Sequence, residues 1–356
     1  MAVRHQIVVK SPAGTRLGLL TGEDALGFNY VREVNGVGAF TLLMSGEHAL
    51  VSSFADGGQV EFWREDPQNS IPRYKDAEFL VDDLLESFVD GQQQFQVSGV
   101  GYNGMLARRV IAAYAGSAQA EKTGKAETVL KAFVNEQIVS AVLAARQITG
   151  LTIQADAASG NTIATYGAWQ PLLDIAKVIA GSGGGDFQVV GTGDGTYELR
   201  WYFGQLGTDR RATVIFALNF GNMKDPTWEV RRSDTINAVL VAGQGQETDR
   251  ATVWALTGTP SGATRREFFV DARDEATTAG LTTRGNAKLD ESKQSAYFDF
   301  LTVQTAALQY GRDYFLGDLV TARYLSHQEY RKIARVAVTG VRGMPEVLEL
   351  GTVSIA

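Results

Sequence analysis

The chain has 356 residues, of which 44% are hydrophobic and 21% charged, proportions that are ordinary for a folded protein and exclude wholesale disorder. Lys and Arg number 33 against 40 Asp and Glu, so the formal net charge of −7 argues against a protein that grips nucleic-acid phosphates. Cysteine is absent, which excludes disulfides, thiolate nucleophiles and zinc–thiolate sites.

The sequence also predicts neither a membrane span nor a leader peptide. No run approaches 18 consecutive apolar residues, and the opening residues MAVRHQIVVKSPAG lack the apolar region of a secretory signal. The three histidines, His5, His48 and His327, lie far apart in unlike contexts, which lowers the expectation of metal or acid–base chemistry. We therefore expect no cofactor and no metal site.

Residues 1–98 have the pattern of short strands joined by turns. The run QIVVKSPAGTRLGLL places a turn at residues 11–14 between two apolar stretches, which is a hairpin signal. A second hairpin is expected around Asn35-Gly36, and residues 66–74 form a polar loop before two further strand-like runs. Short strands at this spacing are typical of a β-barrel or a β-sandwich.

The spacing of apolar residues changes from strand-like to partly helical between residues 99 and 211. Residues 105–114 fit either a short helix or an extended segment. Residues 126–147 give the clearest helical spacing, with Gly150 as the expected stop, and residues 168–180 give a second helix that ends at Gly181. The run DFQVVGTGDGTYELRWYF then reads as a hairpin around residues 191–195.

From Ala212 the sequence is rich in strand-like runs again, interrupted by a polar, helix-compatible stretch near residues 272–293. The whole pattern predicts a mainly β protein with an α/β insertion, in which two β-barrel domains flank a helical middle. We place a first, partial barrel in residues 1–110, the helical α+β middle in 111–211, and the second barrel in 212–356.

One motif invites a nucleotide-binding interpretation. Residues 99–104 (GVGYNG) fit G-x-G-x-x-G after a strand and before a helical run. The preceding strand alternates in polarity, as a half-exposed antiparallel strand does, and no acidic residue ends a second strand about 20 residues later. We therefore expect these glycines to form a turn between a strand and a helix.

Other chemistry-bearing residues are scattered. The carboxylates at 82–83, 271, 274–275 and 290–291 could serve a hydrolase, but solvated faces are their more frequent use. Four arginine doublets, at 108–109, 210–211, 231–232 and 265–266, are not interleaved with the aromatic residues of a nucleic-acid platform, so interface salt bridges are expected of them.

Three segments together resemble one family. They are FQVSGVGYNGMLARRVI at 95–111, FALNFGNMKDPTWEVRRSDTINAVLVAGQGQETDR at 216–250, and YGRDYFLGDLVTARY at 310–324. Their order and spacing resemble the hub proteins of siphophage tails, relatives of the baseplate hubs of contractile phages, along nearly the full chain.

This resemblance implies a structural role and no enzyme activity. Tail hubs of this type are trimers with two β-barrels per chain, so that six quasi-equivalent barrels match the sixfold tail tube above and a threefold fibre or tip lies below. The expected partners are two further copies of the chain, a distal tail or tube protein, a central fibre or tip protein, the tape measure protein, and DNA that passes without sequence-specific binding. The expected location is the virion, at the tail tip.

The net charge and the end of the chain add two expectations. A charge of −7 suggests an acidic lumen that repels passing DNA. Many tail hubs continue into peptidase, lytic or fibre domains, whereas this sequence ends at Ala356 after the strand-like EVLELGTVSI, which weakens an endopeptidase role.

Two alternatives remain open. A tail-associated peptidase or hydrolase would need a perturbed acid–base pair. A carbohydrate-binding tail-tip module could use tryptophans as stacking platforms, and burial of all of them would reject it; they are Trp63, Trp169, Trp201, Trp228 and Trp254.

For the hub we expect interface roles only. The strand edges near 216–223 and 310–324 are the candidates for contacts between subunits, through Phe216, Phe220, Met223, Tyr310, Tyr314 and Tyr324. A second set is expected to form turns instead: Asn222, Asp234, Asn237, Gly317 and Asp318.

Overall fold

The computed structural model describes residues 3–112, 114, 116–193, 195–232, 235–292 and 295–355. The chain divides into two compact units. The first comprises residues 1–224 and 301–356, and the second comprises residues 225–300.

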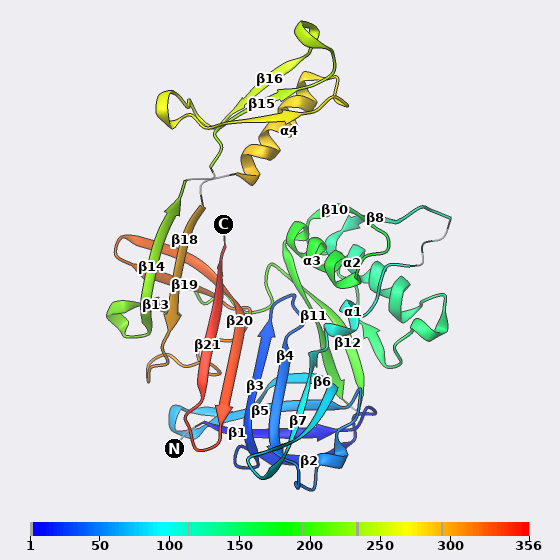
Figure 1. The fold of residues 1–356 in the computed structure, drawn as a ribbon, viewed down its shortest axis with the longest axis vertical. Helices are drawn as coiled ribbons and strands as arrows, with labels where there is room; N and C mark the ends of the chain where they lie inside the picture. The colour runs from blue at the N-terminus through cyan, green and yellow to red at the C-terminus, as the bar shows by residue number, and fades with distance from the viewer. Residues whose placement is uncertain are drawn as a thin grey trace. The chain divides into compact units, whose positions relative to one another are not determined.

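An eleven-stranded sheet dominates the first unit (Figure 1). Its strands are β1 (Arg4–Lys10), β2 (Arg16–Thr21), β3 (Ala25–Glu33), β4 (Ala39–Ser45), β5 (Gln59–Asp66), β6 (Ile71–Val89), β7 (Gln92–Gly101), β13 (Ile215–Ala217), β19 (Leu319–Tyr324), β20 (His327–Val341) and β21 (Val347–Ser354). The order is β13-β19-β20-β3-β4-β7-β6-β5-β1-β2, with β21 on β20. Strands from both ends of the chain therefore share one sheet.

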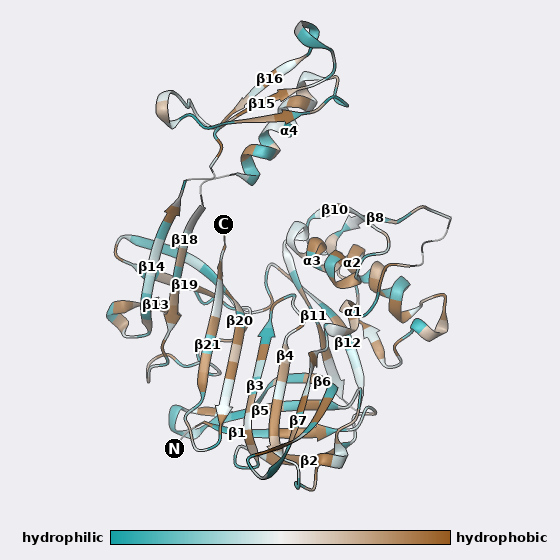
Figure 2. Ribbon diagram, in the orientation of Figure 1, coloured by the Kyte–Doolittle hydropathy of each residue, from teal (hydrophilic) through white to brown (hydrophobic). Residues whose placement is uncertain are grey.

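Alternating polarity explains why these segments form half-buried strands. In β4 every second side chain is buried, beginning with Phe40, and β7 repeats this with Phe95 and Val97. Figure 2 shows β4 as mainly hydrophobic, because Leu43 on its less buried face is apolar too. The mainly β class is confirmed. The two-barrel arrangement stays a prediction, since the strands assigned to both barrels join in one sheet.

The expected hairpins of the first hundred residues are present. β1 pairs with β2 and β3 pairs with β4, both antiparallel, and Asn35 takes φ 58° in the second turn. The expected polar loop at 66–74 is wrong in its second half. A short 3-10 helix covers Pro67–Asn69, and β6 already begins at Ile71, because this segment pairs with the end of β5, with Ile71 opposite Asp66 and Tyr74 opposite Arg64.

The middle of the first unit is a mixed α/β segment whose helices pack through a shared apolar cluster. Its elements are α1 (Gly104–Ala107), β8 (Ala120–Lys125), α2 (Ala126–Val134), β9 (Leu151–Ile153), β10 (Thr162–Gly167), α3 (Leu172–Gly183), β11 (Gly185–Gly193) and β12 (Thr196–Phe203). β11 and β12 form the expected antiparallel hairpin.

Both predicted helices of this segment exist with different ends. The α-helix at Ala126 stops at Val134 and continues as one π-helical stretch, Asn135–Val139, so Val142 of the predicted apolar stripe is 90% exposed. The second helix runs past Gly181 to Gly183. Gly184 ends it in the left-handed conformation at φ 68°, which glycine adopts without strain.

In the second unit, α4 packs on one face of a three-stranded sheet ordered β16-β15-β17. The elements are β15 (Ala238–Ala242), β16 (Thr252–Leu256), β17 (Glu267–Asp271) and α4 (Thr278–Glu291). β14 (Met223–Arg231) and β18 (Ser295–Thr302) pair as a separate two-stranded sheet at the boundary between the units. Within the described residues, no helix is long and apolar enough to span a membrane.

Candidate functional site

A buried carboxylate organises the first unit. Asp76 on β6 is 2% exposed and accepts hydrogen bonds from Tyr30 Oη at 2.6 Å and Tyr310 Oη at 2.7 Å. The guanidinium of Arg32 adds a third bond at 2.9 Å. Burial, and then the Asp76 charge, raise the pKa of both tyrosines well above their usual range, so both hydroxyls stay protonated donors. The cluster fixes the loop that carries Tyr310 to the sheet.

A second buried cluster joins β1, β5 and the turn before β21. Arg64 Nε donates to Glu346 Oε2 at 2.9 Å, a second Arg64 nitrogen bonds Oε1, and His5 Nε2 lies 2.8 Å from Oε2. Burial alone would raise the pKa of Glu346, but the adjacent His5 side chain and the Arg64 guanidinium lower it to about 2. Glu346 is therefore a fully ionised anchor at neutral pH.

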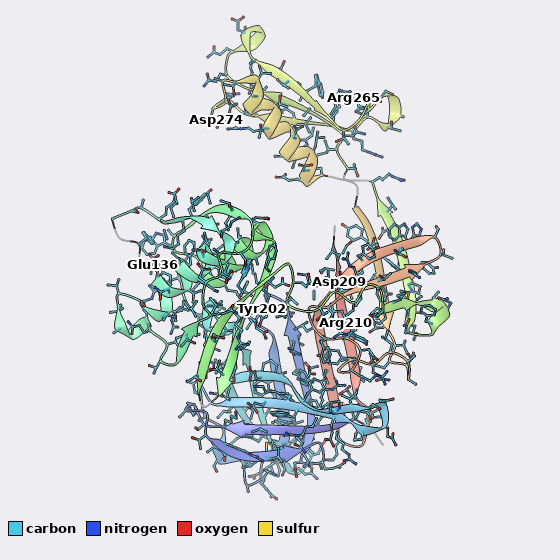
Figure 3. All side chains as sticks on the ribbon, turned by 180° about the vertical axis from the view of Figure 1, so that it is seen from behind. Glu136, Tyr202, Asp209, Arg210, Arg265 and Asp274 are labelled. Carbon is cyan, nitrogen blue, oxygen red and sulfur yellow. The ribbon has the colours of Figure 1, made fainter. Side chains whose placement is uncertain are left out.

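Asp318 forms a turn, as the sequence predicts. It accepts bonds from Thr208 N at 2.6 Å, Arg210 Nε at 2.7 Å and Phe315 N at 2.9 Å. Figure 3 labels Arg210, which lies on the segment that leads from β12 to β13. This segment is thereby tied to the start of β19.

Of the other residues expected to form turns, Asn222 bonds backbone groups close to it in the chain, whereas Asn237 links two distant segments. Asn222 accepts a hydrogen bond from Ala217 N and donates one to Ile215 O, both at 2.8 Å. Asn237 donates to Thr264 O at 2.8 Å, 27 residues away, so it does not form a turn. Gly317 has φ 88°. Asp234 lies outside the described residues. The polar residues that were set apart as turn formers thus satisfy backbone groups wherever the structure describes them.

Asp186 has a role that no sequence pattern indicates. Its buried carboxylate accepts hydrogen bonds from Asn35 Nδ2 at 2.8 Å, Lys332 Nζ at 2.9 Å and Leu206 N at 2.8 Å. It thus joins the turn between β3 and β4 to β20 and to the α/β segment. These partners are far apart in sequence, so no local pattern could have revealed the contact.

Most of the six candidate interface side chains are enclosed by their own chain. Phe216, Tyr310 and Tyr314 are each 0% exposed, and Met223 is 3% exposed. Phe220 is 53% exposed and Tyr324 is partly buried. An interface in these regions would therefore use Phe220, Tyr324 and the strand edges, while the buried aromatics support them from within.

The G-x-G-x-x-G motif forms the expected turn between a strand and a helix. β7 is antiparallel to both neighbours, β4 and β6, unlike the parallel strand of a dinucleotide site. A Cβ at Gly99 would lie 1.8 Å from Leu80 O, and one at Gly101 would lie 2.2 Å from Val37 O. These glycines permit close backbone approach inside the sheet.

The histidines do not converge on a shared site. His5 contacts Glu346, while His48 Nδ1 accepts a hydrogen bond from Leu50 N at 3.1 Å. In the part of the chain that the structure describes, no three His, Asp or Glu side chains are grouped to hold a metal ion.

The arginine doublets bond largely within the chain. Arg108 pairs with Asp82, Arg211 with Asp209 at 2.6 Å, and Arg265 with Glu267. The tryptophans differ in exposure: Trp201 is 5% exposed, Trp254 43% and Trp169 73%. Burial of all five, the condition that would reject a carbohydrate-binding role, is not met.

Comparison with solved structures gives tail proteins that match along nearly their whole length. The 43 kDa tail protein of prophage MuSo2 from Shewanella oneidensis is 14% identical with a TM-score of 0.58, covering 98% of this chain and 97% of that one. A tail protein from Neisseria meningitidis MC58 is 12% identical with a TM-score of 0.55, covering 99% and 96%. Prophage tail protein gp18 from Listeria monocytogenes EGD-e is 10% identical with a TM-score of 0.52, covering 99% and 94%.

At such identities the likeness establishes a shared fold. A search of curated proteins gives no match. The family of siphovirus ReqiPepy6 Gp37-like proteins, however, matches residues 7–349, almost the whole sequence. The resemblance to siphophage tail proteins is thereby confirmed, and this chain belongs to the siphovirus ReqiPepy6 Gp37-like family, with the fold of phage tail proteins.

Proposed function

We propose that the chain is a structural hub subunit of a siphovirus tail tip. The observation that carries this proposal is the family match over residues 7–349, together with a fold shared end to end with phage tail proteins. Three copies form a ring that adapts the sixfold tail tube to a threefold fibre or tip. Each copy contributes two barrel-like domains, one from residues 1–110 and one from 212–356.

The strand edges of the first unit support assembly into a ring. β2 and β13 end the path of the eleven-stranded sheet, and among the described residues β21 pairs with β20 alone. Unpaired strand edges and exposed side chains such as Phe220, which is 53% exposed, are features that an oligomer covers. Burial of these flanks against further copies would make the stability of the ring cooperative.

The ring lines the channel through which the genome leaves. A net charge of −7 favours a lumen that repels the DNA backbone, so that DNA passes without sequence-specific binding. The partners are two further copies, a distal tail or tube protein, a fibre or tip protein, and the tape measure protein. A basic lumen surface in the trimer would refute the electrostatic part of this proposal.

The test is the absolute mass of the purified chain by light scattering, with negative-stain images of the same peak. A mass near three times 38.4 kDa and an annulus with a central hole are expected. A compact monomer that hydrolyses peptidoglycan or peptide would overturn the proposal in favour of a tail-associated hydrolase.

One observation favours a second candidate, a carbohydrate-binding role at the tail tip. Trp169 is 73% exposed, and an exposed indole is a stacking platform for a sugar ring. A glycan array tests this role. Binding that Trp169→Ala abolishes would support it, whereas an array without specific signal would reject it.

A further inference from the structure

The hairpin of β6 and β7 ends in a tip that is both acidic and apolar. β5 pairs with β6 only from Ile71 to Leu80, so among the described residues the outer edge of β6 has no strand partner beyond that stretch. Leu84, Glu86 and Phe88 alternate onto one face there, and Leu84 is 45% and Phe88 71% exposed.

In the part of the chain that the structure describes, the acidic side chains of this tip have no basic partner. No Lys or Arg occurs from residue 82 to residue 107. Asp83, Glu86 and Asp90 are exposed and form no ion pair within the described residues. Natural edge strands are commonly protected by lysine or proline, and residues 81–89 of β6 carry neither. We define the hairpin tip as Leu84, Glu86, Phe88 and Asp90.

A second surface, on the α/β segment, has the opposite character. Trp169 is 73% exposed, Leu143 is 62% exposed and Val110 is 46% exposed. Hydrogen bonds hold them together, because Trp169 N donates to Ile111 O at 2.9 Å and Arg146 bonds both Val110 O and Leu143 O. Trp169 also has a φ of 62°, a conformation that non-glycine residues rarely adopt.

Two arginines supply the charge of this second surface. Arg109 donates to the carbonyl oxygens of Arg108 and Arg146, and Arg146 to Val110 O and Gln137 Oε1. Neither guanidinium has a carboxylate partner within the described residues. We define the basic patch as Arg109, Val110, Leu143, Arg146 and Trp169.

The two surfaces cannot meet within one chain. The tip lies at the start of β7, whereas α1 follows directly after its end, as Figure 1 shows, and Arg109 comes two residues after α1. The ten residues of β7, Gln92–Gly101, separate them by roughly 30 Å at about 3.3 Å per residue. Since both surfaces belong to the same compact unit, only another copy can bring them together.

We propose that the hairpin tip of one copy docks on the basic patch of the next copy. Glu86 and Asp90 then face Arg109 and Arg146, and Phe88 packs on Trp169 and Leu143. Aromatic residues and arginine are the types that dominate protein interfaces, and complementary charge selects the partner. The contact joins two different surfaces, so its repetition closes a ring when the rotation between neighbouring copies is a whole fraction of a turn, which is one third for the proposed trimer.

This inference rests on the proposed trimer for the number of copies in the ring. The absence of cysteine makes disulfide trapping a direct test, because every link must come from introduced residues. Phe88→Cys is combined in the full chain with Val110→Cys, Leu143→Cys or Trp169→Cys, and the products are oxidised and separated without reductant. A disulfide requires Cβ atoms about 4 Å apart, so only direct neighbours are linked.

We expect at least one combination to give linked dimers and a closed trimer, while a mixture of the two single variants gives dimers only. The matched control combines Phe88→Cys with Met344→Cys, an exposed residue outside both surfaces. Linking no greater than this control in all three combinations overturns the inference. If light scattering still shows a trimer, the proposed function survives that result; a monomer without links counts against both.

A charge swap tests the electrostatic part of the contact. Glu86→Arg should reduce the trapped yield about tenfold, and Arg109→Glu or Arg146→Glu in the same chain should restore it. Asp56→Arg, at an exposed acid outside both surfaces, should leave the yield unchanged. An unchanged yield with Glu86→Arg, or no restoration by either partner variant, would contradict the proposed pairing.

Discussion

The two compact units are stabilised in different ways. In the first unit, buried carboxylates such as Asp76 and Glu346 hold segments that are distant in sequence, through tyrosine and arginine partners. In the second, α4 packs on the sheet through a cluster of six buried apolar residues. The first unit therefore adds buried polar partners, whose loss is costly, to an extensive apolar core of its own, whereas the second depends on close packing of a small core.

On the exposed face of the sheet in the second unit, an arginine side chain covers a tryptophan ring. Trp254 is paired with Leu240 across β15 and β16, and Arg265 lies over its ring at 4.6 Å. Arg265 also bonds Glu267. An arginine packed on an indole shields the ring from water while the charged group stays solvated. On this face Arg265 therefore covers the apolar surface that a second layer of helices or strands would otherwise cover.

The largest effect is expected at the centre of the first unit. Asp76→Ala leaves the Arg32 guanidinium and the hydroxyls of Tyr30 and Tyr310 without their acceptor. Removing one partner of a buried charge cluster costs about 3–5 kcal/mol of unfolding free energy. Urea denaturation measures this cost, and Asp56→Ala, at an exposed acid, is the control. If Asp76→Ala lowers the unfolding free energy by less than about 1 kcal/mol, the two units do not differ in how far their stability depends on buried charge.

The next effect depends on pH. The pKa of Glu346 is about 2 in the folded chain against an ordinary 4.5, so the unfolded chain takes up the proton first as pH falls. This carboxylate therefore contributes about 3 kcal/mol above pH 4.5, and the contribution is lost as pH falls toward 2. Glu346→Gln should flatten the dependence of unfolding free energy on pH in that window. Equal slopes for both proteins would count against the assignment.

A packing change should act on the second unit alone. A Cβ at Gly285 in α4 would lie 2.6 Å from Ala255 Cβ and 3.0 Å from Val241 Cγ2. Gly285→Ala should overpack this small core and cost about 1–3 kcal/mol, despite the better helix propensity of alanine. Native-state hydrogen exchange should show faster exchange in β15 and β16 and unchanged exchange in β3 and β4. Faster exchange in both units would mean that they unfold together.

The smallest expected effect is a gain in stability. Gly181 lies inside α3, and a Cβ there would meet no atom within 4 Å. Gly181→Ala should therefore stabilise the first unit by about 0.5–1 kcal/mol, since alanine loses less conformational entropy in a helix. Thermal denaturation of this variant beside Gly285→Ala compares the same substitution with and without room for the methyl group. A loss of stability at Gly181 would contradict this account.

Local patterns in the sequence predicted the elements well where one face of a strand is buried. The strand-like runs after Ala212 correspond to β13 through β21, and the polar stretch near 272–293 contains α4. Helix ends were less well predicted. Apolar spacing continues past Val134 in the sequence, but the backbone leaves the α-helix there and exposes Val142.

The contacts that hold the first unit together could not be predicted in this way. Arg64 and Glu346 are 282 positions apart, and an acidic residue in a strand has the same local signature whether it is buried or solvated. The aromatic residues near 216 and 310 raised a related difficulty. Cores and interfaces both favour aromatic side chains, so sequence alone did not separate buried Phe216 from exposed Phe220.

The pairing of β3 with β20 also has a consequence for biosynthesis. Tyr30 pairs with Val338, so one edge of β3 has no partner strand until the ribosome has made some 300 further residues. The second unit, residues 225–300, emerges completely before that strand exists. Chain growth at about 5–20 residues per second makes this delay roughly 15–60 seconds. The small inserted unit can thus complete its fold during translation, while the larger one must finish afterwards.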